Sequence, residues 1–238
     1  MTNWRLIEDG AGDAAQNMAY DAALFEAVAG NAAPPLLRLY EWNRPSVSVG
    51  RFQSIERTVK AENCERLAIP IVRRITGGRG ILHGYDLTIS AAGIAEPGMN
   101  ALAVYEWLAQ GFIAAFRSLD IAAATGTCSA RQPEETQGDC FACVSQADVV
   151  SAKTGRKLLG AALHLRQDAF LMQASIPLFR EPSSITPAAV FRGQGSQTED
   201  AMRGVSMPSL RRAVVEGFTS ARIFRFNSPS EIDSLCAL

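Results

Sequence analysis

Two residues of this chain, Cys140 and Lys157, have side chains that together could carry an acyl group. A cysteine thiolate is the strongest nucleophile among ordinary side chains at neutral pH, and a neighbouring cation favours it. Lys157 follows after a stretch whose pattern indicates a strand and a turn, so the two side chains could meet across adjacent strands. The lysine could then stabilise the thiolate and donate a hydrogen bond to an acyl carbonyl. The ordinary alternatives are a small buried cysteine and a solvated turn lysine.

A second candidate is the stretch 71–90, IVRRITGGRGILHGYDLTIS. Its glycines and arginines are Gly77, Gly78, Gly80, Arg73, Arg74 and Arg79. The pattern predicts a strand, a glycine-rich loop and a strand, because glycine adopts positive φ freely and lets a ligand approach the backbone. The arginines indicate an anionic or polar ligand close to backbone amides. A glycine-rich hairpin with exposed arginines is the alternative.

Two histidines and a cysteine pair complete the set of candidates. His83 follows the loop and could donate a hydrogen bond beneath it, or be an ordinary hydrogen-bonded loop histidine. His164 alternates with leucines along a predicted strand, which indicates a structural role. Cys140 and Cys143 form a single CxxC. A zinc site would need two further ligands at regular spacing, and a redox CxxC usually opens a helix after a strand. We therefore predict no metal site.

Taken in order, these motifs resemble the lipoate-protein ligase A and octanoyltransferase family, whose cofactor-transferase domain is also related to biotin protein ligase. The resemblance covers roughly residues 4 to 180 and thins out afterwards. Its most specific elements are RRITGGRGILH (73–83), DLTIS (86–90), the Cys140-Phe141 pair and GRKLLGAA (155–162). The loop GGRGILHGYDLTIS is closer to the transferase branch than to the ligases, whose loop usually reads GGG followed by His-Asp.

The resemblance implies an α+β fold with mixed, largely antiparallel sheets flanked by helices. It also implies that Cys140 forms an acyl-thioester and that Lys157 contacts the acyl group. The substrate-binding residues it implies are Arg73, Arg74, Gly77, Gly78, Arg79, His83, Gly160 and Ala161. The donor would be a thioester such as octanoyl-acyl carrier protein, with no cofactor. The acceptor would be a lysine of a lipoyl carrier domain, in the glycine cleavage H protein or the E2 subunit of a 2-oxoacid dehydrogenase. Tyr40, Trp42 and Phe52 could wall an acyl tunnel, although strand aromatics are more often core.

Three other functions stay open at this stage. They are an ATP- and Mg-dependent lipoate ligase in which Cys140 is incidental, an amidotransferase between carrier domains, and a non-catalytic binder. The chain also departs from the family pattern in three places. The spacing from Cys140 to Lys157 is longer by a residue or two, Gly-Ser-Ala reads Gly160-Ala161-Ala162, and Gln-His-Gly-Ser reads Gln173-Ala174-Ser175.

Length and composition limit the possible domain organisation, partners and location of the protein. The chain has 238 residues with 47% hydrophobic composition, enough for one domain spanning 1–238. Its net charge of −1, with dispersed basic residues, argues against nucleic-acid binding. It has neither an apolar run of spanning length nor a signal pattern, so we expect no membrane association and a cytoplasmic location. The five cysteines are an odd number and are expected to be free thiols.

Periodicity predicts the elements that must position these side chains. Expected strands are Trp4–Ile7, Leu36–Tyr40, Ser46–Val49, Phe141–Val150, Lys157–Leu165 and Ala169–Ile176. Expected helices are Asn17–Ala29, Ala61–Ala68, Ala101–Leu119 and Ser209–Ala221. Lys153–Gly155 should form a hairpin turn, 125–139 a surface loop and Pro177–Gly204 a mobile segment.

Overall fold

A computed structural model describes residues 3–126, 138–142, 144–145, 148–178, 185–193 and 200–226. The helices are α1 (Ala14–Ala29), α2 (Ile55–Thr58), α3 (Ala61–Arg66), α4 (Ala101–Ser118), α5 (Pro187–Val190) and α6 (Met207–Ser220). The strands are β1 (Asn3–Gly12), β2 (Leu36–Trp42), β3 (Ser46–Val49), β4 (Ile71–Arg73), β5 (Ile81–His83), β6 (Asp86–Ile94), β7 (Ala123–Thr125), β8 (Val149–Ser151), β9 (Gly160–Arg166), β10 (Ala169–Pro177) and β11 (Arg225–Phe226). Cys140–Ala142 and Asp200–Met202 form 3₁₀ turns.

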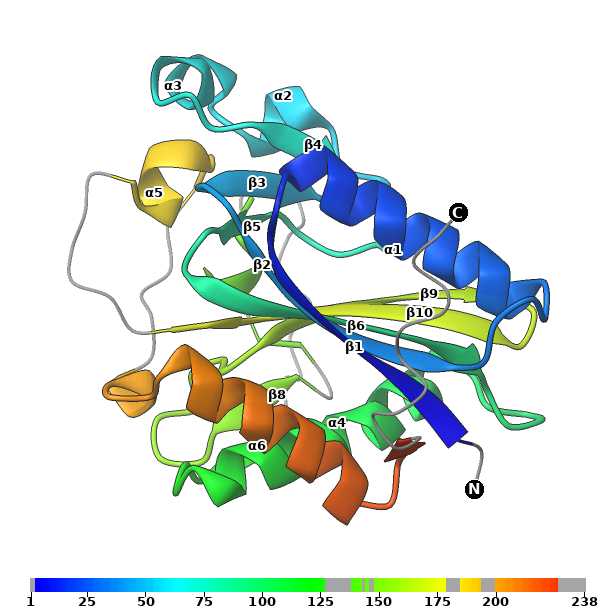
Figure 1. The fold of residues 1–238 in the computed structure, drawn as a ribbon. Coiled ribbons are helices and arrows are strands. Elements are labelled where there is room, and N and C mark those ends of the chain that lie inside the picture. Colours follow the sequence, from blue (N-terminus) through cyan, green and yellow to red (C-terminus); the bar gives the residue numbers. More distant parts are fainter. Residues whose placement is uncertain are drawn as a thin grey trace.

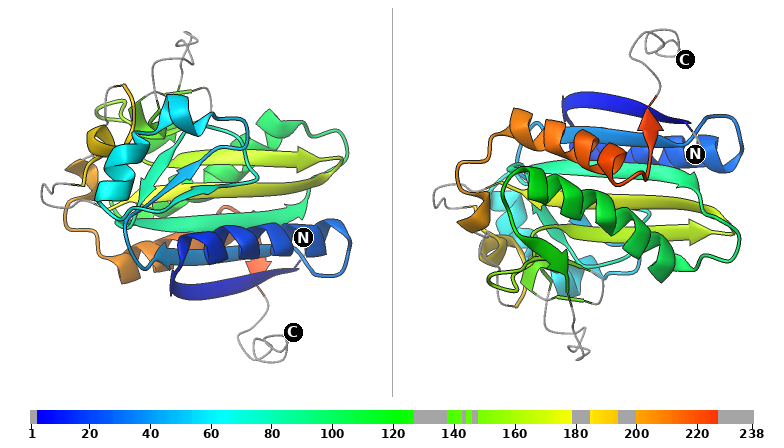
Figure 2. Two further views of the ribbon diagram at one scale, coloured as in Figure 1. Left: turned by 90° about the horizontal axis from the view of Figure 1, so that it is seen from above. Right: turned by 90° about the horizontal axis from the view of Figure 1, so that it is seen from below.

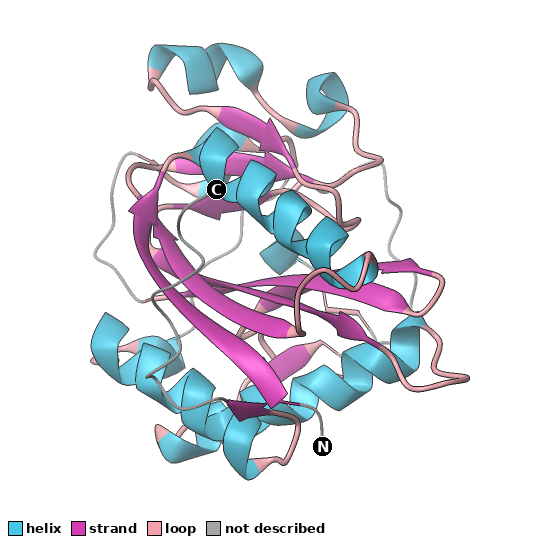
Figure 3. Cartoon of the chain, turned by 45° about the vertical axis from the view of Figure 1, so that its right-hand side comes forward, coloured by secondary structure: helices cyan, strands magenta, loops and turns pink. Residues whose placement is uncertain are grey.

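The main sheet has six strands in the order β11-β1-β2-β6-β10-β9. The pairs β2–β6, β6–β10 and β10–β9 are antiparallel, whereas β1 pairs parallel with β2 and β11. Helices α4 and α6 cover one face of this sheet, and α1 lies on the other (Figure 1; Figure 2). Figure 3 shows the same layers from the side, with the long strands between the helices. The α+β class with mixed, largely antiparallel sheets flanked by helices is therefore confirmed.

The two faces of the main sheet differ in chemistry. On the α4–α6 side, alternate residues of β6 and β10, such as Leu87, Ile89 and Phe170, join the largest apolar core. The residues between them point to the opposite face, where β6 contributes Asp86 and Thr88. All of these residues are buried. Near the start of β6 the second face is therefore a buried polar surface, and its polar groups must find partners inside the protein. Farther along β6, under α1, the same face is apolar, with Leu36, Ala92 and Leu171.

A small sheet with the order β4-β3-β5 lies above that polar face, together with α2, α3 and α5 (Figure 1). The stretch 71–90 is not a simple hairpin, because β4 and β5 do not pair with each other. Both pair with β3, parallel for β4 and antiparallel for β5. The glycine-rich loop, residues 77–80, therefore crosses over the end of β3.

The strand predicted for Phe141–Val150 is wrong. Cys140–Ala142 form a 3₁₀ turn, and β8 begins only at Val149. Two carboxylates draw the backbone away from a ladder, since Asp139 accepts from the Phe141 amide and Asp148 from the Ser145 amide. The strand predicted from Lys157 also begins later, at Gly160. Among the other predicted strands and helices, Ser46–Val49 has the predicted ends and the rest exist with shifted ends. The turn at Lys153–Gly155 is confirmed by Gly155, whose φ is +70°.

Several short elements were not predicted from the sequence: α2, α5, β7 and β11. Their two to four residues give no periodicity to detect. Most of the loop expected at 125–139 and parts of Pro177–Gly204, for which mobility was expected, lie outside the described residues. Within the described chain, none of the helices combines the length and apolar character needed to cross a membrane.

Helices α4 and α6 cross at two glycines. A Cβ added to Gly217 would lie 2.5 Å from the Ala115 nitrogen and 2.5 Å from the Gly111 carbonyl oxygen. One added to Gly111 would lie 2.7 Å from the Phe218 ring. Backbone atoms cannot move aside as a flexible side chain can, so position 217 requires glycine, whereas a Cβ at position 111 would have to displace the buried Phe218 ring.

We predict that Gly217→Ala lowers the free energy of unfolding by about 1–3 kcal/mol, because overpacking outweighs the gain of roughly 1 kcal/mol in helix propensity. Urea denaturation measures it. Gly10→Ala is the matched control, since an added Cβ there has no heavy atom within 4 Å. Equal stability of the Gly217→Ala and wild-type proteins would contradict the packing argument.

Candidate active site

Cys140 and Lys157 meet in the structure, although not across paired strands as expected. Lys157 Nζ lies 3.4 Å from Cys140 Sγ and 3.4 Å from the Cys140 carbonyl oxygen. Lys157 comes from an isolated bridge with Val150 just before β9. Both side chains are buried, at 8% exposure each. A thiol beside a buried ammonium is an arrangement suited to thiolate chemistry.

A carboxylate that sequence reasoning missed completes this group. Asp148 Oδ2 lies 2.9 Å from Lys157 Nζ, and Tyr105 of α4 donates to Asp148 Oδ1 at 3.2 Å. Burial works to lower the pKa of Lys157, but Cys140 and Asp148 outweigh it, so that this pKa lies above its ordinary value. Burial and Asp148 together hold the pKa of Tyr105 well above the ordinary phenol value. At pH 7 the side chain of Asp148 therefore contacts a charged Lys157 and a neutral Tyr105.

The glycine-rich loop fixes the backbone at Cys140. The Cys140 amide donates to the Gly80 carbonyl at 2.8 Å, and the Gly80 amide donates to the Gly138 carbonyl at 2.8 Å. On another side of the thiol, a Cβ at Gly160 would lie 3.1 Å from Sγ. Glycine at 160 therefore leaves space against the sulfur. Ala161 packs with the α4–α6 core instead, and Ala162 is the residue whose Cβ approaches Gly78.

The loop itself is folded around Arg74. Its Nη2 donates to the carbonyls of Gly77 at 2.7 Å and Arg79 at 2.6 Å, and its Nη1 donates to the Ser48 hydroxyl at 3.1 Å. Within the described chain, no carboxylate pairs with this guanidinium. Burial lowers the pKa of Arg74 to about 10, against the opposing effects of Cys140 and Tyr40. Arg74 therefore holds the loop and places a positive charge near Cys140.

Ser48 connects Arg74 to a buried relay on the polar face of the sheet. Ser48 Oγ lies 2.8 Å from His83 Nε2, and His83 Nδ1 lies 2.7 Å from Asp86 Oδ2. The Asp86 carboxylate accepts from Nδ1–H, and Nε2 shares a hydrogen bond with the Ser48 hydroxyl. The Ser48 oxygen also accepts from Arg74 Nη1 at 3.1 Å. Ser175 also donates to Asp86 Oδ2, at 2.6 Å.

Arg73 lies beside a different segment. Its Nη1 donates to the carbonyls of Gly50 and Gln53 at 2.8 Å and of Arg51 at 3.1 Å. The loop is anchored separately on its other side, because Thr76 donates to Gln173 Oε1 at 2.8 Å. Gln173 in turn donates to Asp21 of α1 at 2.7 Å. The two arginines of the RR motif thus organise two adjacent backbone segments.

A family model described as the lipoyl protein ligase A/B catalytic domain matches residues 13–218 of this chain. The chain belongs to this family.

Relatives within the lipoyl protein ligase A/B family carry the name octanoyltransferase LipM. The one from Carboxydothermus hydrogenoformans is 30% identical, with 92% of this chain and 86% of the relative covered. The one from Symbiobacterium thermophilum is 34% identical, with the same coverage of 92% and 86%. These matches extend over nearly the whole chain, so they include both the glycine-rich loop and the region of Cys140 and Lys157.

Solved structures agree on the fold. A lipoate-protein ligase A bound with ATP has a TM-score of 0.76 and 22% identity, covering 95% of this chain and 87% of that chain. The structure of the bi-partite lipoate protein ligase from Thermoplasma acidophilum and its E2 lipoyl domain gives 0.72 and 21%, covering 95% and 86%. At such identities the likeness shows the lipoyl protein ligase fold alone.

Other residues singled out in the sequence lie as follows. Tyr40 and Trp42 are buried, and Trp42 stacks on the His83 ring with centroids 4.0 Å apart. Phe52 is 86% exposed, so its prediction as a tunnel wall is wrong. His164 packs edge-on against Phe25, as a structural residue would. Cys143 lies outside the described residues, and the described part of the chain holds no group of three metal-ligating side chains.

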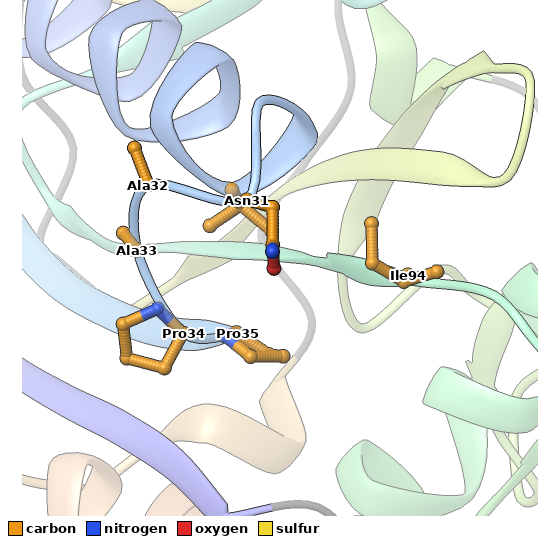
Figure 4. Close-up of a pocket in the computed structure, with 7 residues that line it drawn as sticks. Asn31, Ala32, Ala33, Pro34, Pro35 and Ile94 are labelled. Carbon is orange, nitrogen blue, oxygen red and sulfur yellow. The ribbon is translucent and has the colours of Figure 1, made fainter.

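A separate cavity of about 280 Å³ lies where α1 meets β2 (Figure 4). It is lined by Val28, Asn31, Ala32, Ala33, Pro34, Pro35 and Ile94. Ile94 ends the nine-residue strand β6 that Asp86 begins, so the two residues are separated by roughly 26 Å at about 3.3 Å per residue. The cavity is therefore at the far end of the sheet from the relay.

We predict that Asp86→Asn destabilises the fold by about 3 kcal/mol at pH 7, since it removes one charge of a buried hydrogen-bonded network. Burial raises the pKa of Asp86, but His83, Ser175 and the Gly84 amide outweigh this and leave it below its ordinary value of 3.8. The ionised form thus stabilises the folded state above that value, and this contribution is lost as pH falls through the lowered folded pKa.

Urea denaturation of both proteins at pH 7 and near pH 3 tests this sign. The difference between wild type and Asp86→Asn should shrink at the lower pH. The exposed Asp168→Asn is the control and should change stability by less than about 0.5 kcal/mol. A difference that is unchanged between the two pH values would refute a role for the ionised carboxylate.

Proposed function

We propose that the protein is an octanoyltransferase that holds the acyl group on Cys140 before passing it to a lysine of a lipoyl carrier domain. Two independent lines support this function. Relatives named octanoyltransferase LipM match at 30–34% identity over most of the chain. The observation that carries the mechanism is the thiol of Cys140 at 3.4 Å from the Lys157 ammonium, which is itself held by Asp148.

In the first half-reaction the Cys140 thiolate attacks the carbonyl carbon of an acyl-thioester donor. A new C–S bond forms, and the donor C–S bond breaks to release the donor thiol, which takes up a proton. The donor is already activated, so no ATP is needed. Lys157 stabilises the thiolate before attack and can donate a hydrogen bond to the developing oxyanion. Backbone amides of the glycine-rich loop are further candidates for this second role.

In the second half-reaction the neutral amine of the acceptor lysine attacks the acyl-Cys140 carbonyl. The amide C–N bond forms, the C–S bond breaks, and the amine loses a proton to solvent. The Cys140 thiolate returns to its place beside Lys157, whose positive charge makes it a better leaving group. Covalent catalysis thus divides one acyl transfer into two steps, a thioester exchange and an amide formation.

The partners follow from this chemistry. We propose an acyl carrier protein as donor, and the glycine cleavage H protein or the E2 subunit of a 2-oxoacid dehydrogenase as acceptor. The T. acidophilum ligase structure includes an E2 lipoyl domain, which supports an acceptor of that class. We also propose a cytoplasmic location, consistent with Cys64 and Cys140 being free thiols in the described part of the chain.

We predict that octanoyl-acyl carrier protein, mixed with the protein without ATP, adds the mass of one octanoyl group to Cys140. Intact-protein mass spectrometry measures the adduct, which hydroxylamine should release. Cys140→Ala should form none and should remain folded, because the change removes a single sulfur. Cys64→Ala is the matched control, since Cys64 is also a free buried thiol and should leave the adduct unchanged.

The same assay separates the alternatives. Transfer to a lipoyl domain only after free octanoate, ATP and Mg²⁺ are added would indicate the ligase reaction. An adduct formed from an octanoylated carrier domain rather than from acyl carrier protein would indicate amidotransfer. Binding of the acylated partner with no adduct under any condition would indicate a non-catalytic binder and would refute the acyl-cysteine mechanism.

We predict a graded loss of acylation rate along the chain of contacts from Cys140. Lys157→Met should lower the rate of Cys140 acylation by about 10²–10³-fold, because it removes the charge beside the thiol. Asp148→Asn should cost less, since it keeps Lys157 but loosens it. Tyr105→Phe should cost least. Single-turnover acylation measures all three, and an Asp148→Asn protein that is as slow as Lys157→Met would mean that Asp148 does more than position the lysine.

A further inference from the structure

The most exposed aromatic side chain in the described structure lies on a short turn beside the glycine-rich loop. Phe52 is 86% exposed, compared with 46% for Tyr85 and 45% for Ile94. It belongs to residues Gly50–Gln53, which we call the docking turn and which connect β3 to α2. An exposed aromatic ring beside the active site offers an apolar surface that a partner can bury, and aromatic residues are enriched in protein interfaces.

The docking turn is held in one shape. Arg73 donates to the carbonyls of Gly50, Arg51 and Gln53 at 2.8, 3.1 and 2.8 Å. The Gln53 side chain accepts from the Gly50 amide at 2.9 Å, and the Gln53 amide donates to the Gly50 carbonyl at 3.1 Å. With these backbone groups satisfied by one arginine and one glutamine, Phe52 is presented by a fixed turn.

This turn is in direct contact with the glycine-rich loop. The Arg51 amide donates to the Thr76 carbonyl at 2.9 Å. A Cβ added to Gly50 would lie 2.0 Å from the Gly78 carbonyl oxygen and 2.9 Å from that of Gly77. The docking turn and the loop that holds Cys140 therefore form one packed unit, and a partner bound to the turn is positioned relative to the nucleophile.

The charge around Phe52 is positive. The Arg51 guanidinium lies 5.5 Å from the centre of the Phe52 ring, a cation–π distance. Within the described chain, neither Arg51 nor Arg79 of the loop is paired with a carboxylate. Arg73 adds a third positive charge. The nearest acid in sequence, Glu56, accepts from the Ser54 hydroxyl at 2.7 Å and also interacts electrostatically with Arg73, so Arg51 and Arg79 carry most of the positive charge of this surface.

We infer that Phe52 and Arg51 form the docking surface for the donor acyl carrier protein, with Phe52 as the apolar anchor and Arg51 as its charged neighbour. This inference rests on the proposed acyl transfer. The donor and the acceptor differ in the charge of the group that each brings into the site. The acceptor brings a lysine, which three arginines would repel, whereas the donor brings its thioester on an arm linked through a phosphate. A basic rim with one exposed aromatic ring suits the donor.

The test compares two donors of the same acyl group. One is octanoyl-acyl carrier protein, and the other is octanoyl-N-acetylcysteamine, which carries the thioester without protein or phosphate. For Phe52→Ala and Arg51→Ala, KM for the protein donor should rise by about five-fold or more, as for a residue central to an interface. The rate with the small thioester should stay within about two-fold of wild type. Ile94→Ala, an exposed apolar residue at the far end of the sheet, should leave both donors unaffected.

Each other outcome has a defined meaning. Equal loss with both donors would overturn the inference, because these residues would then act on the chemistry. Unchanged kinetics with the protein donor would overturn it as well. A rise only in KM for the acceptor lipoyl domain would assign the surface to the acceptor and refute docking of the donor. If wild-type protein forms no adduct with either donor, the proposed function fails, which is distinguishable from failure of the docking surface.

Discussion

The guanidinium of Arg74 is the group around which the site is organised. Among the residues that the structure describes, this buried cation has no carboxylate partner and must be satisfied by neutral oxygens, of which the carbonyls of Gly77 and Arg79 supply two. Turning those carbonyls inward forces the loop to fold back on itself. The next residue, Gly80, is thereby placed where its own backbone holds both Gly138 and Cys140. The position of Cys140 thus depends on the carbonyl oxygens that bind Arg74.

The remaining oxygens around Arg74 come from Ser48 of β3 in the small sheet, which His83 connects to Asp86 on the polar face of the main sheet. That face is built by the same strand alternation that gives the α4–α6 core, so each strand serves both purposes with its two sets of side chains. Cys140 interacts with two cations of different origin: Lys157 is paired with Asp148, whereas Arg74 has no carboxylate partner among the described residues. A positive site that is only partly neutralised stabilises the oxyanion that develops during acyl transfer.

Much of this could be predicted from the sequence, for identifiable reasons. Long periodic segments such as α4 and β10 gave the fold class, and the family motif brought Cys140 and Lys157 together before any coordinates. Asp148 was missed because it fell inside the strand predicted for Phe141–Val150, where a single acid is typical of a solvent-facing strand position. The relay was missed because Asp86 and Thr88 alternate with apolar residues, a pattern typical of a strand with one face in water. Only the small sheet covering that face shows that they are buried.

Because of the contact between Gly50 and Gly78, the motif residues alone do not distinguish active members of this family from inactive ones. A Cβ at position 50 would overlap the Gly78 carbonyl oxygen, at 2.0 Å, and would push apart two backbone segments that have no flexible side chain between them. A homologue that kept Cys140, Lys157 and the entire glycine-rich motif but carried alanine at position 50 would look complete in any motif comparison. Its loop would nevertheless be displaced. Whether a homologue keeps the activity therefore depends partly on Gly50, a residue that takes no part in the chemistry.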